Sequence, residues 1–172
     1  MQSSSKYIDL AIGAIQLEID GRNFFLKAAE MSHNNLGKKM FQKLAVDELR
    51  HLTDFKKIFI PIIKGEDWDK LVKSETSKTI SPVIKELTSR LDKAGSASEV
   101  EAIKIGMELE RKAIHFFDGF HKEINDTQAK EIILNICDEE RFHYDLLQSQ
   151  YDSVTNSGFW LDVAEFRMDA RF

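Results

Sequence analysis

Two short segments of the sequence repeat one pattern of carboxylate and imidazole side chains. DELRH at 47–51 and EERFH at 139–143 each contain a Glu-x-x-His pair, and another glutamate stands 30 residues before the glutamate of each pair. The residues of the pattern are Glu18, Glu48, His51, Glu110, Glu140 and His143. A glutamate and a histidine three positions apart share one face of a helix, so each pair can present two ligand side chains in the same direction.

The pattern belongs to a duplication within the chain. AIQLEIDGRNFF at 14–25 aligns without gaps on GMELERKAIHFF at 106–117, and the same offset of 92 residues places DELRH on EERFH. Chance alone gives roughly 0.4 of a Glu-x-x-His pair in a chain of this composition, so the repeat is what makes the pairs informative. Glu30 and His33 have the same spacing without a repeated counterpart, and we interpret them as exposed charges near a helix end.

Apolar residues recur at helical spacing in four long segments. These segments cover about residues 6–31, 38–59, 98–124 and 128–151, and the second ends near a proline at position 61. Short turns separate the members of each pair, whereas more than 30 residues join the two pairs. This connectivity predicts an all-α, ferritin-like four-helix bundle with one long crossover.

The crossover at 61–97 contains the signals of one short helix. Ser81 can cap its start, Pro82 is suited to the first helical position, and Gly95 can end it. We therefore expect a single domain over 1–172, with helical hairpins at 6–60 and 98–152. The aromatic tail at 153–172 is expected to pack on the bundle or on a second subunit.

In such a bundle the four glutamates and two histidines would meet at one level. Burying an ionised carboxylate is costly, and four carboxylates in one cavity also repel one another. Two divalent cations would cancel the four negative charges. Oxygen-rich sites with one imidazole per metal suit iron or manganese and tolerate zinc.

Asp47 and Glu139 occupy matched places immediately before Glu48 and Glu140. A metal-bound imidazole usually donates its other N–H to a carboxylate or a carbonyl. Each of these two acids can therefore reach across to the histidine of the other half. The alternative is that both are solvated.

Composition and charge exclude several classes of protein. The net charge of −5 argues against nucleic acid or an anionic membrane as the partner. No segment approaches the roughly 20 apolar residues of a membrane span, and no secretory signal is present, so we expect a cytoplasmic protein. Cys137, the one cysteine, excludes an intramolecular disulfide and a centre held by several thiolates.

The same residues resemble the rubrerythrins, which are ferritin-like di-iron proteins. AIQLEIDGRNFFLKAAE and FQKLAVDELRHLTDF are similar to the opening hairpin of that family, and the resemblance covers about 6–60 and 97–152. It implies that Glu48 and Glu140 bridge two iron ions. It further implies that Glu18 and His51 complete one iron site, and that Glu110 and His143 complete the other.

The chain departs from this family at three points. Full-length rubrerythrins add a rubredoxin module with four cysteines, which this chain does not contain. They carry a further glutamate one turn after the ligand of the third helix, where this chain has Ala113. They often place a tyrosine near the site at the position of Phe25. The chain therefore lacks the glutamate to which the family's redox-linked iron movement is tied.

The resemblance implies an oxidoreductase that reduces hydrogen peroxide or dioxygen. Its electrons would come from an external donor such as a rubredoxin-like protein, and we expect a homodimer or a larger homo-oligomer. One alternative is an iron-handling ferroxidase, which needs a shell-forming oligomer. Another is a non-catalytic helical bundle that its metals stabilise.

Overall fold

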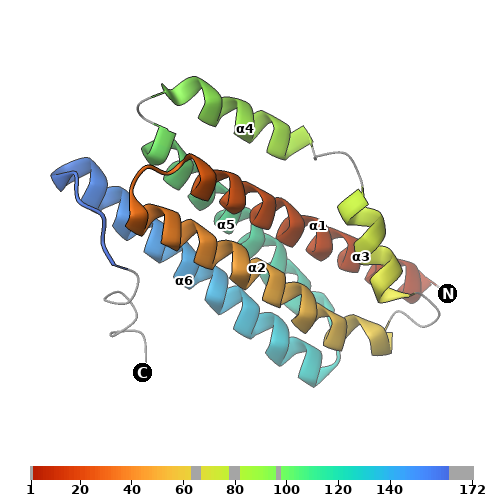
Figure 1. The fold of residues 1–172 in the computed structure, drawn as a ribbon. Coiled ribbons are helices and arrows are strands. Elements are labelled where there is room, and N and C mark those ends of the chain that lie inside the picture. Colours follow the sequence, from red (N-terminus) through yellow and green to blue (C-terminus); the bar gives the residue numbers. More distant parts are fainter. Residues whose placement is uncertain (1, 63–66, 78–81, 96–97, 163–172) are drawn as a thin grey trace.

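Four long helices of the computed structural model form a bundle (Figure 1). The structure describes residues 2–62, 67–77, 82–95 and 98–162, and these residues contain helices and no strand. The helices are α1 (Gln2–Met31), α2 (Asn35–Ile62), α3 (Trp68–Ser77), α4 (Pro82–Ala94), α5 (Ser98–Glu123) and α6 (Thr127–Ser157). The predicted all-α fold is confirmed.

The bundle consists of two hairpins that pack side by side. α1 lies along α2 and α5 lies along α6, while α1 also packs on α5 and α2 on α6. The connection from α2 to α5 crosses the outer side of α1, which contacts both α3 and α4 (Figure 1). This is the predicted bundle with one long crossover.

Side-chain caps define the two tight connections. The Asn34 side chain accepts a hydrogen bond from the backbone N–H of Leu36 at 2.8 Å, which starts α2 three residues earlier than predicted. Asp126 accepts from the N–H of Ala129 at 2.8 Å and starts α6. α6 ends at Gly158, whose φ of 75° is in the left-handed region, so the helix continues six residues beyond its predicted end.

The crossover contains one more helix than predicted. α3 begins after Asp67, whose side chain accepts from the N–H of Asp69 at 3.0 Å. Trp68 anchors the helix on the bundle, because its ring stacks on Phe59 with centroids 5.6 Å apart. The aspartate cap before a short amphipathic segment was the available signal. α4 begins at Pro82 and ends beside Gly95, as predicted.

The first residues of the tail pack on the bundle. The buried Gln150 side chain donates to the carbonyl of Leu161 at 2.7 Å and accepts from its N–H at 3.0 Å. Trp160 packs edge-on against Phe41 and lies directly over Gly37, where a Cβ would be 2.7 Å from the ring. The rest of the tail lies outside the described residues.

The apolar core is divided into two clusters by a polar layer. On α1 the first cluster reaches Ile19 and the second begins at Phe24, and the other long helices divide in the same way. The helix positions at this level carry the glutamates and histidines of the repeat. Two apolar clusters therefore enclose the polar layer from both ends of the bundle. None of the described helices combines the length and the hydrophobicity that a membrane span requires.

Candidate metal centre

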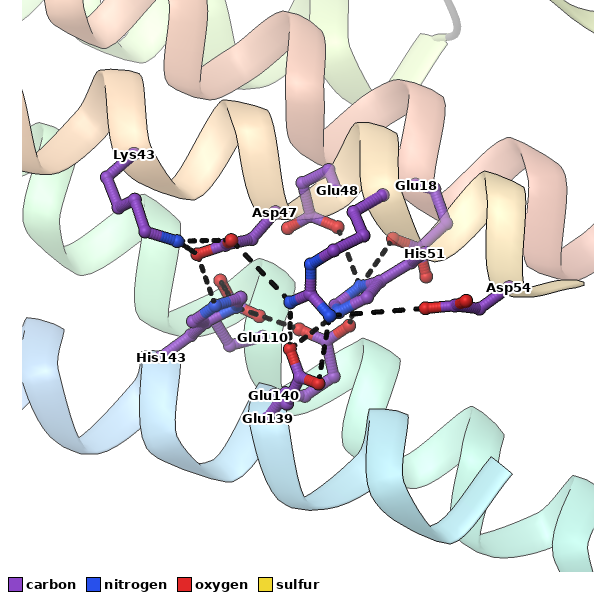
Figure 2. Close-up of polar contacts among 11 residues, drawn as sticks. Glu18, Lys43, Asp47, Glu48, His51, Asp54, Glu110, Glu139, Glu140 and His143 are labelled. Atoms are coloured by element: carbon purple, nitrogen blue, oxygen red, sulfur yellow. Dashed lines mark hydrogen bonds and ion pairs between the residues drawn. The ribbon is translucent and has the colours of Figure 1, made fainter. Parts of the chain in front are cut away.

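The six residues of the repeated pattern converge in the middle of the bundle (Figure 2). α1 and α5 each supply one glutamate, whereas α2 and α6 each supply a glutamate and a histidine. Their exposed fractions are 1% for Glu18, 5% for Glu48, 0% for His51, 1% for Glu110, 0% for Glu140 and 3% for His143. The structure thus brings together all six residues that the sequence singled out and buries them.

These side chains form two overlapping groups of candidate ligands. Within each group, one ligand atom per residue lies within 4.8 Å of the others. The first group consists of Glu18, Glu48, His51 and Glu140, and the second of Glu48, Glu110, Glu140 and His143. Glu48 and Glu140 belong to both groups. The arrangement therefore suits two cations that share two carboxylates.

Both histidines turn the same ring nitrogen toward the carboxylates. Nδ1 of His51 lies 3.1 Å from Glu18 Oε2 and 3.0 Å from Glu140 Oε1. Nδ1 of His143 lies 3.2 Å from Glu140 Oε2 and 3.6 Å from Glu110 Oε1. The two rings are stacked with centroids 6.0 Å apart. Nδ1 is therefore the nitrogen that each histidine can offer to a cation.

The other ring nitrogen of each histidine meets the acid that precedes the Glu-x-x-His pair of the other half. Nε2 of His51 lies 3.3 Å from Glu139 Oε2, and Nε2 of His143 lies 3.4 Å from Asp47 Oδ2 (Figure 2). A carboxylate in this place accepts the N–H of a ligating imidazole and fixes the orientation of its ring. The two halves of the repeat thus orient each other's histidines.

Each of these two acids also contacts a cation from α2. Lys43 pairs with Asp47, and Arg50 pairs with Glu139. Burial alone would raise the pKa of both acids, but the hydrogen bonds from histidine and from these cations outweigh it. They hold the pKa of Asp47 well below its usual range and lower that of Glu139 to about 2. Both acids are therefore negatively charged at neutral pH.

The pKa values of Glu18 and Glu110, the candidate ligands from α1 and α5, shift upward instead. Burial raises the pKa of Glu18 well above its ordinary value, and the charge of Glu48 raises it further. Burial and the charge of Glu140 do the same for Glu110. Carboxylates that share a dry cavity cannot all ionise without a compensating positive charge.

Protons partly supply that charge in the metal-free protein. Burial opposes charging of either histidine, but the neighbouring acids outweigh it. The charge of Glu18 raises the pKa of His51 well above its ordinary value, and hydrogen bonds to Asp47 and Glu140 raise that of His143 to about 9. The cluster therefore stores protons that a cation would have to displace.

We expect metal binding to release protons and to become tighter between pH 6 and pH 8. The raised pKa values keep protons on the metal-free ligands at neutral pH, and a rise in pH removes these competitors of the metal. Calorimetric titration of Mn(II) in two buffers with different ionisation enthalpies measures the release. Equal apparent enthalpies in the two buffers would contradict this expectation.

Buried carboxylate oxygens of the cluster have few hydrogen-bond donors among the described residues. Oε1 of Glu18 is buried and has no hydrogen-bond partner among the described residues, and Oε1 of Glu140 and of Glu110 face only a histidine Nδ1, at 3.0 Å and 3.6 Å. Buried carboxylate oxygens without donors are costly in a folded protein, and coordination to a cation satisfies them. The oxygen-rich donor set with one imidazole per group fits iron or manganese.

Gly21 makes room for one of the shared carboxylates. A Cβ at this position would lie 3.1 Å from both Cδ and Oε1 of Glu48, which is closer than ordinary van der Waals contact. The repeat counterpart of Gly21 is Ala113, which belongs to the apolar core and is the position where the resembling family carries its further glutamate. The absence of a side chain at Gly21 thus leaves the space that the Glu48 side chain occupies.

We expect Gly21→Ala to weaken metal binding by about tenfold, because Glu48 must move by a few tenths of an ångström. The metal-free protein should be no less stable, since alanine is favoured over glycine in a helix by up to about 1 kcal/mol. Gly119→Ala is the matched control, because a Cβ there would meet no atom within 4 Å. Competition with a chelator and urea unfolding measure the two effects. Equal metal affinity in the two variants would be inconsistent with this role of Gly21.

The other chemically capable residues lie away from the centre. Glu30 and His33 are exposed, and neither joins a candidate metal group within the described residues. Cys137 is buried on α6, and burial raises the pKa of its thiol to about 11. It is therefore a buried thiol of low reactivity.

Comparison with known proteins agrees with the fold and with the ligand pattern. A family model for rubrerythrin matches residues 12–151, a range that contains all six candidate ligands. A hypothetical protein from Pyrococcus furiosus has a similar structure, with a TM-score of 0.67 and 19% sequence identity over 87% of this chain and 90% of that chain. At this identity the likeness supports the fold alone. No curated protein matches the chain. The family match spans most of the chain, and the protein belongs to the rubrerythrin family.

Proposed function

We propose that the chain is a di-iron oxidoreductase that reduces hydrogen peroxide or dioxygen to water with electrons from an external donor. The observation that best supports this proposal is the pair of overlapping ligand groups, which share Glu48 and Glu140. Two cations held by shared carboxylates lie close enough to act on one small oxidant together. The rubrerythrin family implies iron as the metal.

The protein residues have two tasks in this reaction. Asp47 and Glu139 hold the imidazoles of His143 and His51, so that both ligands keep one orientation while the charge of the centre changes. Aromatic side chains such as Phe25 and Phe117, which are fully buried in the two apolar clusters, keep bulk water away. A dry cavity with fixed ligands favours small oxidants over larger substrates.

Reduction to water consumes two electrons and two protons for each hydrogen peroxide, and four electrons and four protons for each dioxygen; the external donor supplies the electrons and solvent supplies the protons. Iron, when bound, supplies the electrons and acts as a Lewis acid toward the oxidant. Hydrogen peroxide takes up two electrons and two protons and yields two water molecules. Cys137 alone cannot hold an iron–thiolate carrier of the rubredoxin type, so the proposal places the donor outside these 172 residues.

Anaerobic loading with Fe(II), followed by peroxide or by air in separate experiments, tests this function. We expect the visible absorbance of ferric protein to develop with one of the oxidants and to disappear again after a reductant is added, over repeated cycles. Absence of any spectral change with both oxidants would exclude the function. Continued uptake of iron well beyond the two proposed sites, by a large shell-forming oligomer, would instead favour the ferroxidase alternative.

A further inference from the structure

One arginine contacts both acids that orient the histidines. Arg50 on α2 directs both terminal nitrogens at Glu139, with Nη1 at 3.1 Å from Oε1 and Nη2 in contact with Oε2. Nη2 also lies 3.6 Å from Asp47 Oδ1, and Nη1 lies 4.0 Å from Asp54 Oδ2. The guanidinium group therefore covers the α2–α6 seam of the candidate metal centre, directly outside the histidines.

The two acids differ in how much they depend on this arginine. The side chain of Asp47 is short and 9% exposed, and Lys43 on the same helix also holds it. The side chain of Glu139 is one carbon longer and 38% exposed, and its cationic partner Arg50 comes from the opposite hairpin. Without that partner, solvent would compete for Glu139, whereas Asp47 would keep its lysine.

The contact with Arg50 orients the Glu139 carboxylate as well as neutralising its charge. Two parallel N–H groups on the two carboxylate oxygens hold the plane of the carboxylate, which a single ammonium group cannot do. The oxygen Oε2 of Glu139 that meets Arg50 is also the oxygen that lies 3.3 Å from Nε2 of His51. The position of the His51 ring is therefore coupled to the guanidinium through one atom.

Among the described residues, the two-nitrogen contact of an arginine exists only on the His51 side, since Asp47 has a single Arg50 nitrogen at 3.6 Å. The position 92 residues after Arg50 is Phe142, which cannot form an equivalent ion pair with Asp47. The support of His51 and the support of His143 are thus unequal, although the ligands themselves follow one duplicated pattern. The asymmetry arises from residues outside the Glu-x-x-His motif.

We propose that Arg50 is a positioning residue of the metal centre, which holds Glu139 against His51 and thereby sets the metal affinity of the group formed by Glu18, Glu48, His51 and Glu140. The inference rests on the metal centre of the proposed function. It predicts that the two metals bind with unequal affinities and that Arg50 controls one of them. A surface ion pair that only joined α2 to α6 would affect stability and leave this difference unchanged.

Titration of metal-free protein with Co(II), followed by calorimetry and by visible absorption, tests the proposal. We expect Arg50→Gln to weaken one of two binding steps by about 10-fold to 100-fold, the range found when partners of ligating histidines are changed. The other step should stay within error of the parent protein. Arg90→Gln is the control, because Arg90 is also a partly exposed arginine that contacts two acids, Glu101 and Glu108, and neither acid belongs to a candidate ligand group. The control should leave both steps unchanged.

Two further variants separate positioning from a structural role. Arg50→Lys should recover part of the lost affinity, because an ammonium group can donate to one carboxylate oxygen. If Arg50 acts through Glu139, Arg50→Gln should add no further loss to Glu139→Gln, and the double-mutant cycle measures this coupling. If Arg50→Gln does not fold, Arg50→Lys and Glu139→Gln still test the proposal, because each should weaken the same single binding step.

Three results would overturn the proposal. The first is an Arg50→Gln protein that binds both metals as tightly as the parent protein does. The second is an equal loss of affinity at both binding steps, together with a lower melting temperature of the metal-free protein. Additive losses in the cycle would also exclude action through Glu139. The titration needs no oxidant, so a protein that binds two metals without reducing peroxide refutes the proposed reaction and leaves this inference open to the same measurement.

Discussion

Replacing Glu140 with alanine is expected to remove both metals from the protein. Glu140 belongs to both ligand groups, and its two oxygens lie 3.0 Å from Nδ1 of His51 and 3.2 Å from Nδ1 of His143. Loss of this carboxylate takes one ligand and one compensating negative charge from each cation. Elemental analysis of protein loaded with excess Fe(II) or Mn(II) and then desalted should show a fall from two ions per chain to nearly none.

The chain provides matched controls for this variant. Glu18→Ala removes a residue of one group alone, so it should retain about half of the metal. Glu30→Ala removes the exposed glutamate of the unmatched Glu-x-x-His pair and should retain all of it. Circular dichroism establishes whether each variant keeps its helices. A fully loaded, folded Glu140→Ala protein would disprove a shared ligand at this position.

Removal of the metals should have the second large effect, a pronounced loss of thermal stability. A ligand at one thousand times its dissociation constant stabilises the folded state by about 4 kcal/mol for each site. For a domain of this size each kcal/mol corresponds to about 2–4 °C in melting temperature. With two sites, calorimetry should show the metal-free protein melting at least about 15 °C below the loaded protein.

The charges of the cluster give the physical reason for this loss. Burial and mutual repulsion raise the pKa of both Glu18 and Glu110, so the metal-free centre must hold protons on buried carboxylates. Glu140→Ala tests the assignment, because metal should no longer raise its melting temperature. If a chelator left the melting temperature of the parent protein unchanged, the cluster would not be a metal centre that contributes to folding.

The duplication explains why so much of the site could be predicted from the sequence. Glutamate and histidine at positions i and i+3 must share a helix face, and the offset of 92 residues applies the same constraint twice. Alignment of the two halves of the chain also separated Glu30 and His33 from the six ligand candidates, and the structure places both of these residues on the surface. That the six residues bind iron stays a prediction until metal is measured.

The features that sequence reasoning missed depend on local caps and on contacts between the halves. α3 is short, and its Asp67 cap competes with several other polar residues of the crossover for the same role. Arg50 has no matching arginine in the second half of the repeat, where Phe142 stands. Its partner Glu139 lies 89 residues away on another helix. Gly21 matters only because of the side chain that packs over it. None of these contacts has a periodic signature along the chain.

Anomalous X-ray scattering from crystals of iron-loaded protein would test the central claim most directly. The account predicts two iron peaks in the middle of the bundle, one beside Glu18 and His51 and the other beside Glu110 and His143. Glu48 and Glu140 should be ligands of both. No peak at this level of the bundle, or peaks at surface positions alone, would contradict it.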